Sequence, residues 1–298
     1  MTPLRHAVRV TERLVDLYDA VVLDLDGVLY IGSDVVPHAR ESVHDIANAG
    51  CEVWFATNNA SRSAREVSAL LTSLGFDAPT ERILVAGEIT AACARTQFPQ
   101  ARVVRIVGTE ALAEYMRQAG FEVLRDNDVA SLSAPSDADA ARAASVGEQL
   151  RVDLVVQGHD PVTGWSRLTQ ALRDIDAGAK WIATNDDATI PLPEGIGLGN
   201  GSMVAALRNA SGHAPDLVVG KPHPWMFREL RRRTHARRPL IVGDRLDTDI
   251  AWAHTVGVDS LLVRTGIDAS ADRSAPADFW PTWVADDLRG LLNAPQPW

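Results

Sequence analysis

Cysteine and long hydrophobic runs are both scarce in this chain. Cys51 and Cys93 are its two cysteines, too few for a disulfide framework or a cysteine-rich zinc site. The N-terminal segment lacks the uninterrupted apolar core of a signal peptide, and no stretch approaches the roughly 20 apolar residues that a membrane span needs. We therefore expect a cytoplasmic protein without a membrane partner.

Positive charge is also in short supply. Lys and Arg number 29 against 39 Asp and Glu, which gives a formal net charge of -10. An acidic protein repels the phosphate backbone of nucleic acids, so no nucleic-acid partner is expected. The basic run Arg231–Arg233, with Arg237 and Arg238, is then expected on the solvated face of an outer helix. A small phosphorylated metabolite stays acceptable as a partner, because a bound metal ion can set the local field.

What the chain does have is the composition of a globular protein and an alternation of strand and helix patterns. Hydrophobic residues make up 46% and charged residues 23%, enough for a substantial core in one large or two smaller domains. Short apolar runs alternate with segments of helical periodicity, which predicts a parallel sheet with helical crossovers. The predicted strands are 21–23, 51–57, 102–107, 121–124, 153–158, 180–184, 216–219, 239–243 and 259–263. The predicted helices are 37–49, 62–74, 88–96, 110–119, 165–177, 202–210, 223–234 and 247–256.

Four segments fall outside this alternation. The chain up to about Asp16 has the character of a polar extension. Residues 131–150, rich in Ala, Ser and Asp, are expected to form an exposed insertion, and residues 185–201 a polar loop. The tail that contains four prolines is expected to be irregular, which would make 259–263 the last strand of the core.

The first apolar run ends in two aspartates. Val21–Leu23 is followed by Asp24, Asp26 and Gly27. Two unit charges about 4 Å apart repel by about 4 kcal/mol at an effective dielectric constant near 20. A cation between them would turn this cost into a gain, so the pair suggests a metal site. A strand that ends in an ordinary turn is the alternative interpretation.

Polar residues also follow three later strands. Thr57, Asn58 and Asn59 suit either a helix N-cap or a group of donors around a phosphate. Lys221, between a glycine and a proline, is either solvated or held in a turn against a phosphate oxygen. The three carboxylates of 244–249 exceed what a helix N-terminus requires and fit a hard cation such as Mg²⁺. In open α/β sheets ligands bind beyond the carboxyl ends of the strands, so these residues are expected to meet there.

Together these residues describe a reaction. An aspartate attacks phosphorus, and water then hydrolyses the aspartyl phosphate. A second carboxylic acid protonates the leaving alkoxide and later activates the water. Mg²⁺ and a lysine neutralise the charge of the phosphate dianion during the attack.

The order and spacing of these residues resemble those of phosphatases of the haloacid dehalogenase superfamily. Asp24-x-Asp26-Gly27-Val28-Leu29 resembles the first motif of that family, Thr57 the second, Lys221 the third and Gly243-Asp244-x-x-x-Thr248-Asp249 the fourth. The resemblance implies that Asp24 is the nucleophile and a metal ligand, and that Asp26 is the general acid and base and binds the metal through its carbonyl. It also implies binding of the phosphoryl group by Thr57, Asn58, Asn59 and Lys221, completion of a Mg²⁺ site by Asp244, and orientation of its waters by Asp249. The dehalogenase branch is disfavoured because it does not need the second aspartate.

The long interval between Thr57 and Lys221 resembles the subgroup that carries an inserted α/β cap of the C2 type, which includes p-nitrophenyl phosphatases. The expected organisation is a Rossmann-like catalytic core at 1–88 and 216–298, with the cap at 89–215. Within the subgroup, the chain is most similar to phosphoglycolate and glycerol-3-phosphate phosphatases, particularly those of actinobacteria. The stretches that carry this similarity are 57–62, 108–112, 199–203 and 243–250. Caps of this kind often mediate dimers, and the sequence leaves a homodimer through the cap open.

The cap is expected to select the substrate. Asp187, Thr189 and Asn200 are the candidate contacts with the leaving group, with ordinary polar turns as the alternative. Asp187 would accept a hydrogen bond from a hydroxylated leaving group such as glycerol and would repel a carboxylate such as glycolate, which favours glycerol 3-phosphate. Phosphoglycolate, a nucleoside monophosphate or another sugar phosphate are alternative substrates, and a non-catalytic phosphometabolite-binding protein is a more distant alternative.

Overall fold

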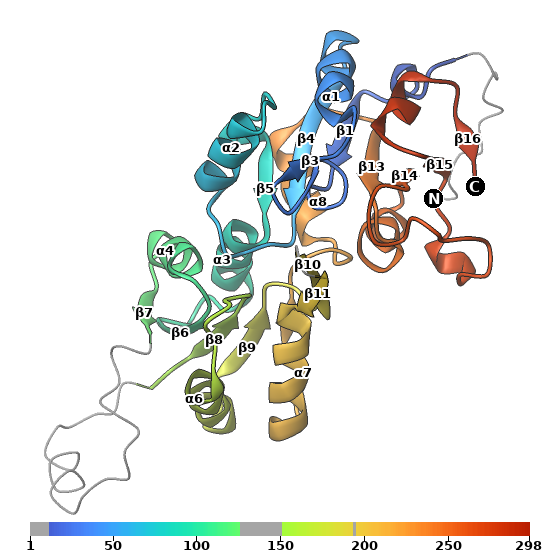
Figure 1. Cartoon of the computed structure of the whole chain (residues 1–298). Coiled ribbons are helices and arrows are strands. Elements are labelled where there is room, and N and C mark those ends of the chain that lie inside the picture. Colours follow the sequence, from blue (N-terminus) through green and yellow to red (C-terminus); the bar gives the residue numbers. More distant parts are fainter. Residues whose placement is uncertain (1–11, 126–150, 193–194) are drawn as a thin grey trace, which may run out of the picture.

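The fold contains two parallel sheets that lie one beyond the other (Figure 1). It is described by a computed structural model for residues 12–125, 151–192 and 195–298. A seven-stranded sheet, here the core sheet, has the strand order β16-β15-β14-β13-β1-β4-β5. A five-stranded sheet, here the second sheet, has the order β12-β9-β8-β6-β7. The expected α/β architecture is confirmed.

The core sheet is parallel except at one edge, where β15 and β16 pair antiparallel. β1 is an interior strand between β13 and β4, and its four residues are all buried, as expected of a parallel strand covered on both faces. Val21 and Leu23 belong to one apolar cluster, while Ala20 and Val22 belong to the cluster on the opposite face. The strands are β1 Ala20–Leu23, β4 Glu52–Thr57, β5 Ile83–Val85, β13 Pro239–Gly243, β14 Ser260–Val263, β15 Trp283–Ala285 and β16 Gln296–Pro297.

Helices cover both faces of the core sheet. α1 (Ala39–Asn48) and α2 (Ala64–Ser73) contribute to the cluster that contains Val21. α3 (Ala86–Gln97), α8 (Trp225–Arg233) and α9 (Ala251–Val256) contribute to the opposite cluster. α2 begins where its sequence specifies, because Ser63 and Glu66 form a reciprocal capping box at its N-terminus.

The second sheet is parallel throughout and has its own helices. Its strands are β6 Val103–Val107, β7 Glu122–Leu124, β8 Leu154–Gln157, β9 Lys180–Ala183 and β12 Leu217–Val218. α6 (Trp165–Asp176) and α7 (Asn200–Ser211) pack on one face in a separate apolar cluster. On the other face, α4 (Glu110–Gln118) joins α3 in a cluster that is continuous with the core sheet. This shared cluster fixes the second sheet against the core.

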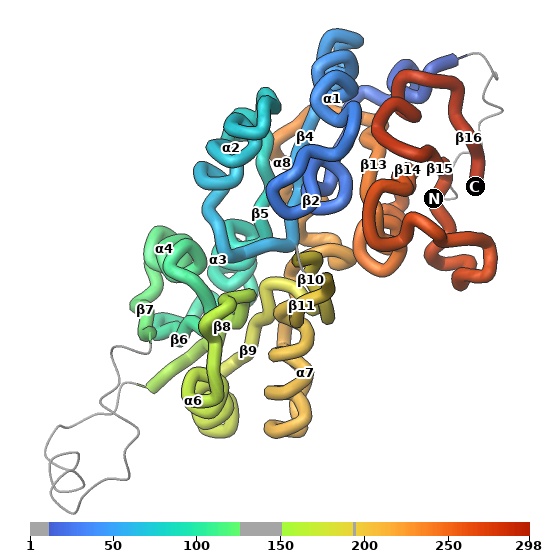
Figure 2. Tube along the Cα trace, in the orientation of Figure 1, coloured from blue at the N-terminus to red at the C-terminus, as the bar shows by residue number. Residues whose placement is uncertain are grey.

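The chain passes between the two sheets twice, from β5 through α3 to β6 and from β12 through α8 to β13 (Figure 2). Two hairpins lie outside both sheets: β2 (Tyr30–Ile31) with β3 (Asp34–Val35), and β10 (Thr189–Leu192) with β11 (Gly195–Leu198). Short 3₁₀ segments are Leu14–Asp16, Thr80–Arg82, Ala277–Phe279 and Leu288–Leu292, and Leu246–Ile250 is a π-helical turn. None of the helices among these described residues is long and apolar enough to cross a membrane.

Several expectations for secondary structure are wrong. The polar loop predicted at 185–201 contains the β10–β11 hairpin, whose Pro191 and two glycines hide the strand pattern. The strand at 259–263 is not the last of the core, since β15 and β16 extend the same sheet from the proline-containing tail. The predicted strands also omitted β5, a three-residue strand, and the two-residue strands β2 and β3. Short strands give too few residues for a periodic pattern to be recognised. The expected insertion at 131–150 lies outside the described residues.

The strand predicted at 216–219 forms, but in the second sheet. β12 pairs with β9 through Leu217 and Ile182 and through Val218 and Ala183. The expected core segment that begins at residue 216 therefore starts with a strand of the second sheet. A two-residue strand carries no sequence feature that distinguishes which of two neighbouring sheets it joins.

Candidate active site

The carboxyl ends of three adjacent core strands meet at one point. Asp24 follows β1, Asp244 follows β13, and Thr57 is the last residue of β4. β1 lies between β4 and β13, so these residues are neighbours although they are far apart in the chain. The Asp24 N–H donates to the Val242 carbonyl at 2.9 Å, which carries the β1–β13 pairing one residue beyond the strand. This is the position at which open α/β sheets bind their ligands.

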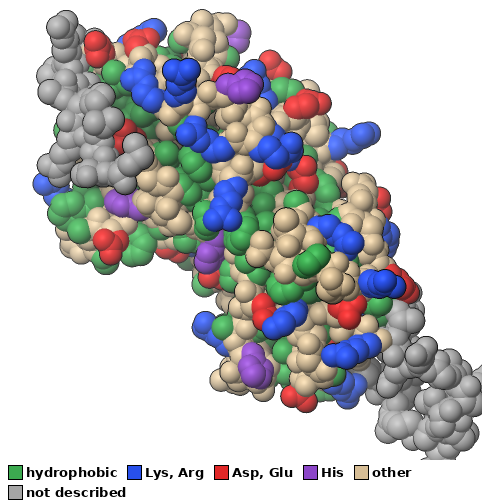
Figure 3. Space-filling view, turned by 180° about the vertical axis from the view of Figure 1, so that it is seen from behind, with side chains coloured by type: hydrophobic (Ala, Val, Ile, Leu, Met, Phe, Trp, Pro, Cys, Tyr) green, Lys and Arg blue, Asp and Glu red, His purple; other side chains and the backbone are tan. Residues whose placement is uncertain are grey.

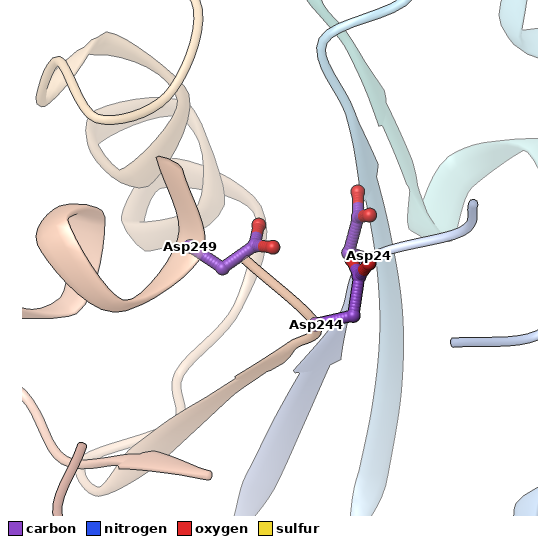
Figure 4. A group of neighbouring side chains, drawn as sticks. All are labelled: Asp24, Asp244 and Asp249. Carbon is purple, nitrogen blue, oxygen red and sulfur yellow. The ribbon is translucent and has the colours of Figure 1, made fainter. Parts of the chain in front are cut away.

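Three carboxylates converge there. One oxygen from each of Asp24, Asp244 and Asp249 lies within 4.8 Å of the other two (Figure 4). Asp249 comes from the π-helical turn that follows β13. A Cβ at Gly243 would lie 2.2 Å from the Asp249 Cγ, so glycine is needed for this close approach. Gly27, with a φ of +81°, lies as close to Asp244, where a Cβ would be 2.4 Å from Oδ2.

Lys221 brings a buried positive charge to this group. Its Nζ donates to Asp24 Oδ1 at 2.5 Å and to Asp249 Oδ1 at 2.6 Å. Burial acts to lower the pKa of Lys221, but Asp24 and Asp249 outweigh that effect and hold the pKa well above its usual value. Lys221 is one of only two lysines in the chain. Its ammonium group is a compact point charge, which here is shared between the two carboxylates.

The carboxylate group is suited to a divalent cation. Asp244 Oδ2 accepts the Ile267 N–H at 2.7 Å, whereas the buried Oδ1 has no hydrogen-bond partner among the described residues. Burial, followed by the charges of Asp24 and Asp249, raises the pKa of Asp244 to about 8. A buried carboxylate oxygen without a partner is unfavourable, and a hard cation bound to it removes that penalty. The residues present therefore fit Mg²⁺.

Asp26 lies beside the three carboxylates but in a different setting. The turn at Gly27, whose N–H donates to the Tyr30 carbonyl at 2.8 Å, carries Asp26 past the end of β1. Burial raises the pKa of Asp26, while the charges of Lys221 and Arg62 and a hydrogen bond with Tyr30 partly offset that rise. A carboxyl group with a raised pKa can hold a proton and donate it.

The loop after β4 is shaped by its own side chains. Thr57 Oγ1 accepts the Asn59 N–H at 3.0 Å, and Asn59 Oδ1 accepts the N–H and the hydroxyl of Ser61 at 2.8 and 2.6 Å. The Asn58 carboxamide bonds the backbone of Lys221: Oδ1 accepts its N–H at 2.7 Å and Nδ2 donates to its carbonyl at 3.0 Å. Thr57 and Asn58 are therefore brought to the site, and the Asn59 side chain turns toward Ser61.

The three candidate substrate residues have different surroundings in the structure. Asp187 reaches the site, where both of its oxygens accept from Asn58 Nδ2 at 3.1 Å. The Thr189 carbonyl accepts from Arg245 Nη1 at 3.4 Å, so it also borders the core. Asn200 is buried, and its Nδ2 donates to the carbonyls of Asn185 and Gln157 at 2.7 and 3.4 Å. Asn200 thus supports the loop that carries Asp187.

Two contributors, Arg245 and the Ile267 N–H, were missed from the sequence, and Asn185 was identified only as the first residue of the candidate substrate loop 185–189. Asn185 donates from Nδ2 to the Asn58 carbonyl at 2.7 Å, Arg245 links to Thr189, and the Ile267 N–H orients Asp244. Arg245 directly follows Asp244, and Asn185 opens the polar loop, so both positions lie next to residues that were identified. A backbone N–H gives no signal in the sequence.

Comparisons with known proteins agree with this geometry. A family model described as haloacid dehalogenase-like hydrolase matches residues 21–122, and a HAD-hydrolase-like model matches residues 218–291. D-glycerol 3-phosphate phosphatase of Mycobacterium tuberculosis is 39% identical over 94% of this chain and 74% of its own. Dihydroxyacetone phosphatase of Corynebacterium glutamicum is 30% identical over 91% of this chain and 89% of its own.

Two solved structures show the same fold. The glycerol phosphate phosphatase of M. tuberculosis in complex with magnesium superposes with a TM-score of 0.81 at 38% identity, over 94% of this chain and 78% of its own. The p-nitrophenyl phosphatase of Archaeoglobus fulgidus gives 0.75 at 28% identity, over 93% and 99%. The predicted superfamily is therefore confirmed. This chain belongs to the haloacid dehalogenase-like hydrolases and is an enzyme of that family, and the relatives reported above are phosphatases.

Proposed function

We propose that the protein is a Mg²⁺-dependent phosphatase that hydrolyses a small phosphate monoester through an aspartyl phosphate on Asp24. The observation that carries this proposal is the meeting of three carboxylates within 4.8 Å, with the Lys221 Nζ bonded to two of them. Asp24 directly follows β1, an interior strand of the core sheet, and lies beside both the positive charge and the other candidate metal ligands.

Asp24 and Asp26 divide the chemistry between them. An Asp24 carboxylate oxygen bonds to phosphorus as the bond from phosphorus to the ester oxygen breaks, and Asp26 gives its proton to the leaving alkoxide. Water then attacks the phosphorus of the aspartyl phosphate, and the Asp26 carboxylate takes a proton from it. The bond from phosphorus to the Asp24 oxygen breaks, which releases inorganic phosphate. The raised pKa of Asp26 supports its role as the proton donor in the first step.

Asp24, the Asp26 carbonyl and Asp244 would hold the metal, with Asp249 orienting its waters. Mg²⁺ supplies positive charge against the phosphate and the developing charge of the transition state. Lys221 supplies the second positive charge from its position between Asp24 and Asp249. The Thr57 hydroxyl and the loop through Asn58 and Asn59 are the proposed further contacts with the phosphate.

Glycerol 3-phosphate is the proposed substrate. Similarity to the M. tuberculosis glycerol 3-phosphate phosphatase over most of both chains supports it. The hydrogen bonds of Asp187 to Asn58 weaken the separate argument that its carboxylate meets the glycerol hydroxyls. Dihydroxyacetone phosphate is a second candidate, because the C. glutamicum relative carries that name. Phosphoglycolate, nucleoside monophosphates and other sugar phosphates complete the panel.

The second sheet is proposed to act as the cap. The proposed cap begins at about residue 89, as the sequence suggests. It ends at about residue 219 instead of 215, because β12 belongs to the second sheet. We propose a cytoplasmic protein that uses neither nucleic acid nor membrane, in keeping with its net charge of -10. On the face drawn in Figure 3, Lys and Arg side chains are interspersed with acidic and apolar ones. Exposed apolar side chains of α6 and of the β10–β11 hairpin, Trp165, Ile196 and Leu198, favour a homodimer through the cap.

A substrate panel tests the proposed function. Phosphate release from the esters named above and from p-nitrophenyl phosphate is measured with Mg²⁺ and with EDTA. We expect Mg²⁺-dependent turnover, with glycerol 3-phosphate giving the highest kcat/KM. Phosphoglycolate turned over tenfold more efficiently would overturn the substrate, and release of phosphate in EDTA at the Mg²⁺ rate would overturn the mechanism.

A further inference from the structure

We propose that Asp187 is a positioning residue of the phosphate-binding site, which acts through Asn58 on the backbone of Lys221. The inference rests on the proposed function and deepens it. It assigns to the second sheet a part in building the phosphate site, separate from any contact with the leaving group.

The first step is the bond between Asp187 and Asn58. Asp187 lies in the loop between β9 and β10, 129 residues from Asn58, and each carboxylate oxygen is 3.1 Å from Asn58 Nδ2. Nδ2 also donates to the Lys221 carbonyl at 3.0 Å. A carboxamide nitrogen has two N–H groups, so one bonds the carbonyl and the other is shared between the two carboxylate oxygens.

The second step leads from Asn58 to the reacting groups. Asn58 Oδ1 accepts the Lys221 N–H at 2.7 Å, so the carboxamide holds both the N–H and the carbonyl of one residue. From that backbone the Lys221 Nζ reaches Asp24 Oδ1 at 2.5 Å. Any rotation of the Asn58 side chain breaks both backbone contacts, and Asp187 is the group that opposes rotation from the other side.

The second sheet also holds the backbone of Asn58. Asn185 Nδ2 donates to the Asn58 carbonyl at 2.7 Å, and Asn185 Oδ1 accepts the Asp187 N–H at 3.2 Å. Gly220 permits this close packing, because a Cβ there would lie 2.7 Å from Asn58 Oδ1 and 2.8 Å from the Asn185 Cβ. Asn58 is therefore held through its side chain and its main chain by one loop of the second sheet.

The negative charge of Asp187 has a specific use in this place. A carboxylate near a phosphate site repels the substrate unless its charge is engaged by other groups. Asp187 faces the Asn58 amide and the positive charges of Arg245 and Lys221, which together oppose the nearby negative charge of Asp249. A carboxylate accepts a stronger hydrogen bond from an amide than a neutral side chain does, and so it orients Asn58 more firmly.

Inorganic phosphate tests the proposal, because it has no leaving group. Its inhibition constant and the KM and kcat for glycerol 3-phosphate and p-nitrophenyl phosphate are measured with Mg²⁺ for Asp187→Ala, Asp187→Asn, Asn58→Ala and the double variant Asp187→Ala/Asn58→Ala. Asp186→Ala is the matched control, since it removes the same charge from the adjacent, exposed position. Circular dichroism and the unfolding midpoint verify that each variant is folded.

We expect Asp187→Ala to weaken phosphate inhibition and to raise KM for both esters by a similar factor, about tenfold. Asp187→Asn, which keeps one acceptor for Asn58, should recover to within about threefold of the wild type. The double variant should be no weaker than Asn58→Ala alone, because Asp187 acts through Asn58. If Asp187→Ala fails to fold, Asp187→Asn in the same cycle carries the test.

Two results would overturn the inference. A loss confined to glycerol 3-phosphate, with phosphate inhibition unchanged, would make Asp187 a leaving-group contact. The double variant is the second test. If its loss of phosphate affinity equals the product of the losses in Asp187→Ala and Asn58→Ala, Asp187 does not act through Asn58. If the wild type hydrolyses none of the esters, the proposed function fails, and calorimetric titration of the same variants with phosphate and Mg²⁺ still decides the inference.

Discussion

The two sheets contribute to the site in different ways. The core sheet supplies charged groups directly from strand ends: Asp24 after β1 and Asp244 after β13. The second sheet supplies a loop whose Asn185 and Asp187 bond Asn58 of the core. The core thus carries Asp24 and Asp26, the proposed reacting groups, whereas Lys221 and the loop that supports Asn58 follow strands of the second sheet. A charged residue directly after a strand can therefore be recognised in the sequence as a candidate for the chemistry. A residue that supports such a group, such as Asn185, is recognised only from its hydrogen bonds in the structure.

The largest expected effect is on the core side. Asp24→Asn removes the proposed nucleophile while it keeps the size of the side chain, and we expect kcat to fall at least about 10³-fold. Asp34→Asn, in the exposed β3 strand, is the matched control and should keep the wild-type rate. Phosphate release from p-nitrophenyl phosphate measures both. Turnover by Asp24→Asn within tenfold of the wild type would show that the reaction uses another nucleophile.

Close packing at the site predicts a difference in stability between the sheets. Gly243→Ala places a Cβ 2.2 Å from the Asp249 Cγ, so the free energy of unfolding should fall by about 1–3 kcal/mol. Gly164→Ala, at the start of α6 in the second sheet, meets no atom within 4 Å and should cost less than about 1 kcal/mol. Urea unfolding in EDTA provides the comparison. Equal losses would contradict the tight packing of the core site.

The carboxylates also predict how stability varies with pH in the metal-free protein. Burial raises the pKa of Asp249 and Asp187 to about 6 and of Asp244 to about 8, from an ordinary value of 3.8. The folded state then binds protons more tightly than the unfolded state, so stability falls as pH rises from about 4 to about 8. His159, whose pKa burial lowers, opposes this trend below about pH 6.5.

Thermal unfolding between pH 5 and pH 8 measures the trend. In EDTA we expect the midpoint to fall as pH rises, and with Mg²⁺ we expect a smaller fall, because a cation favours the ionised carboxylates. The stabilisation by Mg²⁺ should therefore grow with pH. A midpoint in EDTA that rises across this range would contradict the raised pKa values of Asp187, Asp244 and Asp249.

The smallest expected effect is on the second sheet. Asn200→Ala removes hydrogen bonds to the carbonyls of Asn185 and Gln157, so the free energy of unfolding should fall by about 1 kcal/mol. The ratio of kcat/KM for glycerol 3-phosphate to that for p-nitrophenyl phosphate should stay within about twofold of the wild type. A larger change in that ratio would indicate that Asn200 contacts the leaving group.

The same contrast explains what could be predicted from the sequence. Asp24 and Asp244 were found because each follows an apolar strand of one parallel sheet, and parallel strands bring their carboxyl ends together. Lys221 was also found because it follows an apolar run, although its strand, β12, lies in the second sheet. Pro239–Gly243 was predicted to the residue because it is a fully buried run. β10 and β11 were missed because Pro191 and two glycines break their pattern, and β12 was assigned to the core because two residues do not specify a sheet.

Individual contacts were beyond prediction for a physical reason. The sequence places Asp187 in a polar loop, but which partner its carboxylate meets depends on how two sheets pack, with Asn58 lying 129 residues away. The support from the Ile267 N–H to Asp244 is a main-chain contact that any residue could make. Residue type therefore predicts which groups react, and packing decides which groups hold them.

The most direct test of the central claim is to find the phosphoryl group on the enzyme. The wild type is mixed with p-nitrophenyl phosphate and Mg²⁺, quenched in acid within the first turnover, digested and analysed by mass spectrometry. The mechanism predicts a peptide heavier by one phosphoryl group, with the modification on Asp24. A phosphoryl group on another residue, or rapid turnover with no modified peptide, would contradict it.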